Sequence, residues 1–154
     1  MRGHLLALMV HHQPEPFRTL RKTLSELSVE TFSVETCEEA QGMISLCRPH
    51  VVFAEPSLPD GSWQSLVNLA QNAEVPLNVI VVENFPNTRS YVSVMECGAF
   101  DFVVPPFEHA PLEFIVRSAF LDANRRRETP LFAASIERFA LGRAQGQHRT
   151  VRAV

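Results

Sequence analysis

The sequence is poor in the residues that build several common kinds of site. Its three cysteines, Cys37, Cys47 and Cys97, are an odd number without a C-x-x-C spacing, which favours reduced thiols over a disulfide framework or a zinc knuckle. The six glycines form no phosphate-binding loop, and no serine or cysteine nucleophile is recognisably paired with a base. We therefore expect no enzyme activity and no cofactor.

Long apolar runs are also absent. No stretch approaches the roughly 20 residues of a membrane-spanning helix. The apolar segment LLALMV at residues 5–10 lacks the charged start, the length and the cleavage site of a signal peptide. The composition is that of an ordinary globular protein, and 154 residues are enough for one domain. We expect a cytoplasmic protein without membrane contact.

Basic residues are scarce until the end of the chain. Up to Asn124 there are 7 Lys or Arg against 15 Asp or Glu, a net charge of −8, whereas from Arg125 onward there are 7 against 2, a net charge of +5. Such a shift in composition often marks a boundary. It predicts a folded domain over residues 1–127 and a basic tail over residues 128–154.

The tail has its own apolar pattern. The spacing predicts a short amphipathic helix that ends near Gly142 and carries Leu131, Phe132, Ile136, Phe139 and Ala140. This segment could pack back on the body, dock a partner or begin a linker. Because no helix-turn-helix pattern accompanies the positive charge, we expect no nucleic-acid contact through this chain.

Five short apolar runs predict β-strands, at residues 5–10, 29–34, 51–54, 78–82 and 100–104. Between and after them lie stripes of helical spacing. One follows a capping-box pattern at Thr36 and Glu39, and another follows the turn LPDGS, with Ser62 as its N-cap. This alternation predicts an α/β fold with a doubly wound, five-stranded parallel sheet in the flavodoxin-like order 2-1-3-4-5.

Several stretches carry a family resemblance. The proline turn after the first strand, "RPHVVFAEPSLPDGS", "PLNVIVVEN" and "CGAFDFVVPPFE" make residues 4–124 resemble the receiver domains of two-component response regulators, the CheY-like superfamily. The last stretch is the most specific. The resemblance implies a module of phosphorelay signal transduction whose working groups lie at the carboxyl ends of the strands.

The resemblance also implies five positions for the phosphorylation site. In receivers these are two acidic residues that hold Mg²⁺, an aspartate that accepts the phosphoryl group, a hydroxyl residue and a lysine. They fall here, in that order, on His11 and His12, Glu55, Glu83 and Pro105. The family's switch aromatic falls on Phe102 and its Pro-Phe pair on Pro106 and Phe107.

Every chemical position of the site is therefore changed. Imidazoles are poor substitutes for the oxygen ligands that Mg²⁺ prefers. The extra methylene of Glu55 would misplace an in-line attack. Glu83 adds repulsion where a hydroxyl would donate, and Pro105 supplies no ammonium group. We predict a degenerate receiver, without a metal site, that acts as a phosphorylation-independent, non-enzymatic signalling module.

The same residues allow other interpretations. His11 or His12 could pair with Glu55 and Glu83, could bind a transition metal as a metal-responsive switch, or could be ordinary polar residues at a strand end. Glu55 or another residue could still accept a phosphoryl group. Glu55 could also imitate the phosphorylated state, although a carboxylate imitates a phosphoryl group weakly.

A candidate interaction face is the remaining prediction. On the last helix Phe114 and Leu121 fall off the core stripe, and Tyr91 and Val92 lie on the helix before it. The resemblance implies that the face made by helix 4, strand 5 and helix 5 binds a second copy or a protein partner, such as a sensor kinase or an output domain. The alternative is that the chain's own tail covers these side chains.

Overall fold

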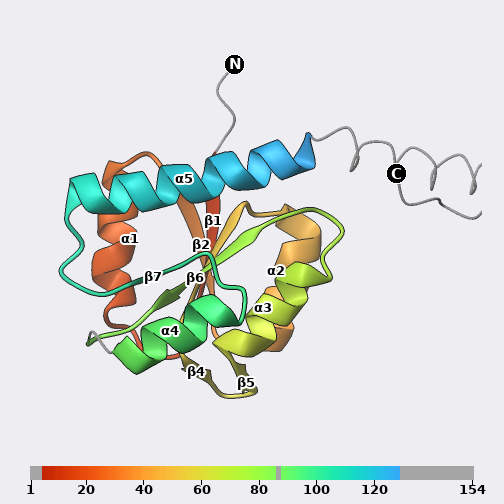
Figure 1. Ribbon diagram of the computed structural model, residues 1–154, viewed down its shortest axis with the longest axis horizontal. Coiled ribbons are helices and arrows are strands. Elements are labelled where there is room, and N and C mark those ends of the chain that lie inside the picture. Colours follow the sequence, from red (N-terminus) through yellow and green to blue (C-terminus); the bar gives the residue numbers. More distant parts are fainter. Residues whose placement is uncertain (1–4, 86–87, 129–154) are drawn as a thin grey trace, which may run out of the picture.

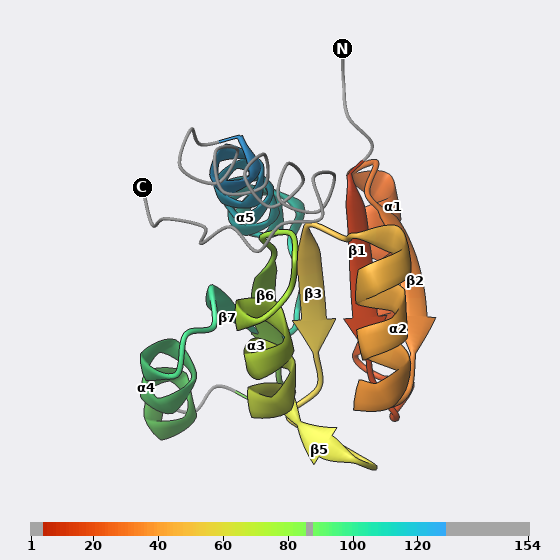
Figure 2. The ribbon, with the colours of Figure 1, turned by 90° about the vertical axis from the view of Figure 1, so that its right-hand side faces the viewer.

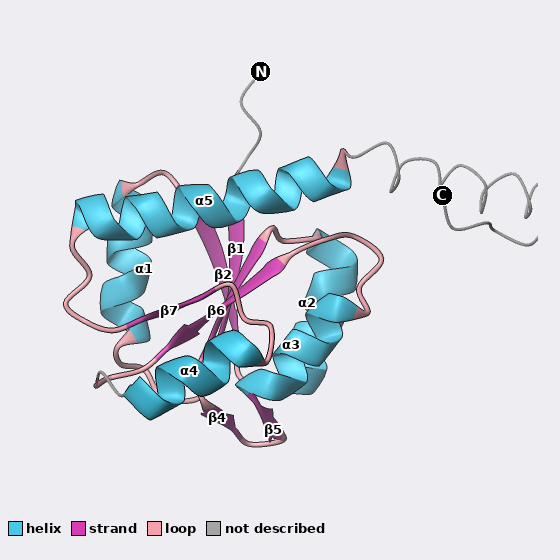
Figure 3. Ribbon diagram, viewed as in Figure 1, coloured by secondary structure: helices cyan, strands magenta, loops and turns pink. Residues whose placement is uncertain are grey.

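Strands and helices alternate along the chain, as the apolar runs predict (Figure 3). The computed structural model describes residues 5–85 and 88–128. The main sheet contains β1 (Leu6–Val10), β2 (Glu30–Val34), β3 (Val51–Ala54), β6 (Asn78–Val82) and β7 (Asp101–Val103). The helices are α1 (Phe17–Glu26), α2 (Cys37–Cys47), α3 (Trp63–Gln71), α4 (Thr88–Glu96) and α5 (His109–Arg127).

The five strands form one parallel sheet in the order β2-β1-β3-β6-β7. This is the predicted order 2-1-3-4-5, so the predicted fold class is confirmed. The central strands β3 and β6 are buried along their whole length, because helices cover both faces of the sheet. Their carboxyl ends meet at one edge of the sheet, since all five strands run in the same direction.

Two apolar layers fill the space between the sheet and the helices (Figures 1 and 2). One layer joins the sheet to α1 and α5 and includes Phe17, Phe53 and Phe120. The other joins it to α2, α3 and α4. On α4, Val94 is buried against this second layer, while Tyr91 and Met95 face outward.

A short antiparallel hairpin, β4 (Ser57–Leu58) and β5 (Gly61–Ser62), occupies the predicted LPDGS turn. Ser62 is the N-cap of α3, as predicted. Thr36 likewise caps α2, but the Glu39 carboxylate accepts the N–H of Glu35 at 2.9 Å, so the predicted capping box is displaced by one residue.

The carboxylate of Asp60, in the hairpin turn, ties the hairpin to a distant helix. It accepts the N–H groups of Cys37 at 2.7 Å and Glu38 at 3.1 Å, at the start of α2. These hydrogen bonds from backbone amides, chiefly that from Cys37, lower the pKa of the Asp60 carboxyl. They fix the hairpin that follows β3 against the start of α2.

The last turn of α5 is fastened to the amino-terminal edge of the sheet. The buried Asn78 donates to the carbonyl of Ala119 at 2.9 Å and to Asp122 at 3.1 Å, and accepts a hydrogen bond from Arg126 at 2.7 Å. The helix ends at Arg127. Residues 129–154, with the predicted tail helix, lie outside the described residues. Within the described part, no helix has the length and apolar character to span a membrane.

Candidate functional site

The five positions implied by the resemblance gather where the strands end. His11 and His12 follow β1, Glu55 follows β3, Glu83 follows β6, and Pro105 comes two residues after β7. The backbone N–H groups of His11, Glu55 and Glu83 extend the ladders by donating to Val34, Val10 and Val103, at 3.0–3.1 Å. The backbone positions of these three residues are therefore fixed at the carboxyl edge of the sheet.

Glu55 is the centre of the site. Its Oε1 accepts the backbone N–H of His12 at 2.7 Å and lies 3.4 Å from the N–H of Gln13, which also donates to it. A hydrogen bond from an amide to a carboxylate is roughly twice as strong as one between neutral groups. The glutamate side chain thus links the end of β3 to the loop between β1 and α1.

His11 is held away from both carboxylates of the site. Its ring stacks on Phe17, with 4.2 Å between ring centroids and an angle of 3° between planes, and its Nδ1 lies 2.6 Å from the carbonyl of Gln13. Because a carbonyl only accepts, Nδ1 carries the proton. Among the described residues, the buried Nε2 has no hydrogen-bond partner. The His11 side chain therefore packs against the start of α1.

His12 turns toward a different carboxylate. Its Nδ1 lies 3.8 Å from an oxygen of Glu35, after β2, and both side chains are exposed. The predicted pairing of the histidine side chains with Glu55 and Glu83 is therefore wrong. Backbone N–H groups occupy Oε1 of Glu55 instead, and the exposed His12 imidazole lies beside Glu35.

Glu83 is partly buried at the end of β6. Burial raises the pKa of the Glu83 carboxyl above the ordinary glutamate value. Glu83 and Glu55 both line a small pocket of about 210 Å³ beside Phe17, and Glu55 also lines an open groove of about 540 Å³ on the hairpin side. Within the described residues, no group of three or more His, Cys, Asp or Glu side chains is placed to hold a metal ion.

The switch positions lie under α4. The ring of Phe102 meets Tyr91 edge-on, with 5.9 Å between centroids and 81° between planes. The Pro105–Pro106 peptide bond is cis. Pro106, with Phe102 and Ile115, lines a groove of about 190 Å³ between β7 and α5.

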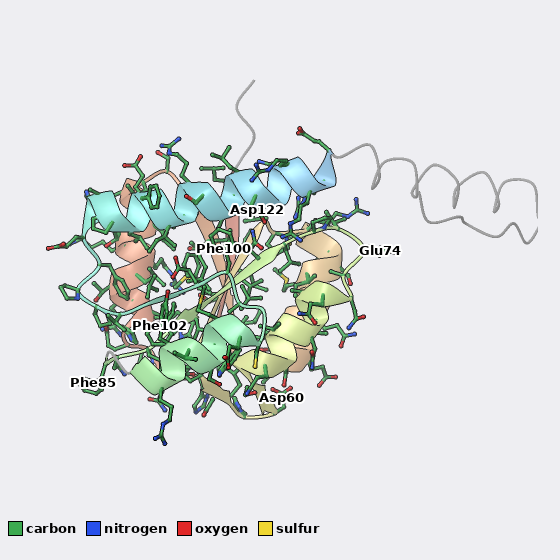
Figure 4. The ribbon with its side chains drawn as sticks, in the orientation of Figure 1. Asp60, Glu74, Phe85, Phe100, Phe102 and Asp122 are labelled. Carbon is green, nitrogen blue, oxygen red and sulfur yellow. The ribbon has the colours of Figure 1, made fainter. Side chains whose placement is uncertain are left out.

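The four residues of the predicted interaction face are all exposed. Phe114 is 73% and Leu121 is 60% exposed on α5, and Tyr91 and Val92 are about half exposed on α4. Sequence reasoning missed Phe85, which lines the small pocket and is 78% exposed (Figure 4). Its position in the loop after β6, two residues beyond Glu83, is the signal that could have identified it as a residue of the site. It also missed Asp60, because the α2 amides that this residue caps lie more than 20 residues earlier in the chain.

Known proteins resemble this chain in both sequence and structure. It is 25% identical over 122 residues to the response regulator protein PilR of Pseudomonas aeruginosa, which covers 79% of this chain and 27% of PilR. The receiver domain of a sensor histidine kinase from Pseudomonas aeruginosa PAO1, with a magnesium ion coordinated in its active-site cleft, superposes with a TM-score of 0.66 at 17% identity, over 77% of this chain and 98% of that domain.

A second solved structure agrees. The signal receiver domain of a signal transduction histidine kinase from Syntrophus aciditrophicus superposes with a TM-score of 0.64 at 24% identity, over 82% of this chain and 97% of that domain. No family model matches the chain. The chain spans about a quarter to a half of the length of the curated relatives it matches. These likenesses confirm the predicted resemblance to response regulator receiver domains.

The Glu55 link makes a prediction about the loop after β1. In Glu55→Ala the His12 amide loses a charged acceptor, so its proton resonance should move upfield and its exchange with water should become about tenfold faster or more, which corresponds to about 1.4 kcal/mol. Amide NMR spectra measure both effects. Glu55→Gln is the matched control, because its side-chain carbonyl still accepts, and it should show a smaller change. An unaltered His12 amide in the alanine variant would contradict the link.

Burial of Glu83 predicts a dependence of stability on pH. A carboxyl whose folded-state pKa is raised binds more protons in the folded state, so its contribution to the free energy of unfolding falls as pH rises from the ordinary glutamate pKa through the raised one. Glu83→Gln should remove this loss, so its free energy of unfolding should exceed that of the wild type at pH 7. Below the ordinary glutamate pKa, at about pH 4, the variant should have no such advantage. Urea unfolding across this pH range tests it. The exposed Glu96→Gln should leave the profile unchanged; parallel profiles for Glu83→Gln and wild type would be contrary evidence.

Proposed function

We propose that this receiver domain is a phosphorylation-independent signalling module of a cytoplasmic two-component pathway, and that it acts by binding protein partners. One observation carries the proposal. The side chain at the phosphoacceptor position, Glu55, is already engaged by the backbone amides of the β1–α1 loop. The site is thus closed by a hydrogen bond within the chain, at the place where the family uses a metal ion and a phosphoryl group.

The charges around Glu55 argue against phosphoryl transfer. A transferring phosphoryl group needs cations and donors that stabilise its developing negative charge. Pro105 offers no ammonium group, and Glu83 adds a second carboxyl instead of a hydroxyl. The His11 ring is stacked on Phe17, and the His12 ring faces Glu35. Each of the groups that would support the reaction is missing or turned elsewhere.

A permanent internal link suits a binding module better than a switch driven by phosphate. The bond from Glu55 holds the β1–α1 loop, and the bonds from Asp60 hold the hairpin and the start of α2. Loops fixed in this way present a constant surface, which lowers the entropy that a partner must remove on binding. The regulatory input would then be the partner itself.

The apolar surface on α4 and α5 is the proposed place of contact. Tyr91, Val92, Phe114 and Leu121 are exposed, and β7 lies between the two helices (Figure 1). The groove between β7 and α5 offers a recess for one apolar side chain. Exposed apolar side chains beside such a recess are typical of interaction sites. We propose that a second copy of the chain binds here and forms a homodimer, and that a sensor kinase or an output domain is a further partner.

Treatment with acetyl phosphate and Mg²⁺ tests the first part of the proposal. The intact mass of the protein should show no added phosphoryl group, whereas a receiver domain that keeps the acidic pair, the aspartate and the lysine should gain one under the same conditions. Glu55→Gln is the matched control. An adduct that appears on the wild type and disappears in this variant would identify Glu55 as a working phosphoacceptor and overturn the proposal.

Sedimentation analysis tests the interaction face. Replacement of Phe114 and Leu121 by aspartate should raise the dimer dissociation constant by about 30-fold or more, because loss of a single interface hot spot costs about 2 kcal/mol. Leu46→Asp is the control, since Leu46 is 78% exposed on α2, away from the proposed face. If the double variant and wild type have the same monomer–dimer balance, this face is not the dimer contact.

A further inference from the structure

A groove lies between the carboxyl-terminal ends of α2 and α3, at the opposite end of the sheet from Glu55. Its volume is about 180 Å³. The apolar side chains that line it are Ile44 from α2, Leu69 and Ala73 from the α3 side, and Val75 and Leu77 from the segment that leads into β6. The polar residues Gln41, Ser45 and Asn72 also line it. A recess lined by apolar side chains with a few polar groups is typical of a pocket for one apolar side chain.

The volume limits what can occupy the groove. A protein cavity of about 150 Å³ is large enough to hold a benzene molecule. The groove therefore has room for one aromatic ring. A stable contact between two separate molecules buries at least about 1,000 Å² in total. A recess for a single ring supplies only a small part of that area, so it suffices by itself for a segment that is covalently tethered nearby, whereas a separate protein would need further contact surface around it.

The chain itself supplies such a tether, because α5 ends at the mouth of the groove. The Arg127 guanidinium donates from Nε to the carbonyl of Pro76 at 2.8 Å, and from Nη2 to the carbonyls of Pro49 at 2.8 Å and Arg48 at 3.2 Å. Arg48 lines the groove, and Pro76 lies between two lining residues. Figure 4 shows Glu74, another lining residue, on the same side of the molecule as the end of α5.

We propose that Phe132 of this chain docks in the groove between α2 and α3. Phe132 is the first aromatic residue after Glu128, the last described residue, and lies four positions beyond it. Four residues of extended chain span up to about 14 Å. A tether this short gives the side chain an effective concentration in the millimolar range, at which even a weak contact is occupied.

Charge favours the same occupant. The tail from Glu128 onward carries four Arg against two Glu, a net charge of +2, and the chain up to Arg127 carries 10 Lys or Arg against 15 Asp or Glu, a net charge of −5. The opposite net charges of the tail and the body favour such docking, and Arg48 and Glu74 place one charge of each sign at the groove. Docking of Phe132 makes the groove and the start of the tail unavailable to any partner that needs either one. The proposal uses no residue of the Glu55 site and does not depend on the proposed function.

NMR of the full 154-residue chain tests the docking directly. Nuclear Overhauser effects should connect the Phe132 ring to the methyl groups of Ile44, Leu69 and Val75. In Phe132→Ala these effects should vanish and the methyl resonances of the groove should shift. Phe139→Ala is the matched control, because it removes an aromatic residue of the same tail and should leave the groove methyls unchanged.

Three results would overturn the proposal. The first is unshifted groove methyls in Phe132→Ala. The second is a set of contacts that arises from Phe139 instead. The third is contacts that appear only between differently labelled copies in a mixed sample, because they would show that the tail of a second molecule occupies the groove. Ala73→Phe provides an independent check, since a ring built into the groove should displace Phe132 and abolish its contacts.

Discussion

The hydrogen bond from the His12 amide to the Glu55 carboxylate is the contact on which the site depends. It joins two neighbouring strand ends, β1 and β3, through a side chain long enough to reach across. The glutamate side chain thereby holds the β1–α1 loop. Once the carboxylate is engaged, the imidazoles are free to take other partners.

The site is also arranged without a concentrated positive charge. His11 has its proton on Nδ1 and is packed against Phe17, and the exposed His12 lies beside Glu35. Burial raises the pKa of the Glu83 carboxyl above the ordinary glutamate value. Hydrogen bonds from backbone amides thus replace ionic interactions as the source of order at this edge of the sheet.

The two edges of the sheet are organised in different ways. At the carboxyl edge, carboxylates from loops bind backbone amides, as Glu55 and Asp60 do. At the amino edge, the guanidinium groups of Arg126 and Arg127 bind backbone carbonyls of the loops before β3 and β6. Charged side chains therefore satisfy exposed backbone groups at both edges. The second arrangement also fixes the end of α5 beside the loops before β3 and β6.

The sequence by itself determined the strands, their order and the positions that carry the site. Buried β-branched runs separated by helical stripes admit few other arrangements, and parallel strands bring residues that follow them to one edge. Which of those residues bind one another was decided only by the tertiary structure. The contacts of Glu55 with the His12 amide, and of Asp60 with α2, join residues more than 20 positions apart and use backbone groups, which every residue possesses and no sequence pattern marks. The directions of the His11 and His12 imidazoles were not predictable either. They depend on Phe17 and Glu35, which reach these side chains only in the folded protein.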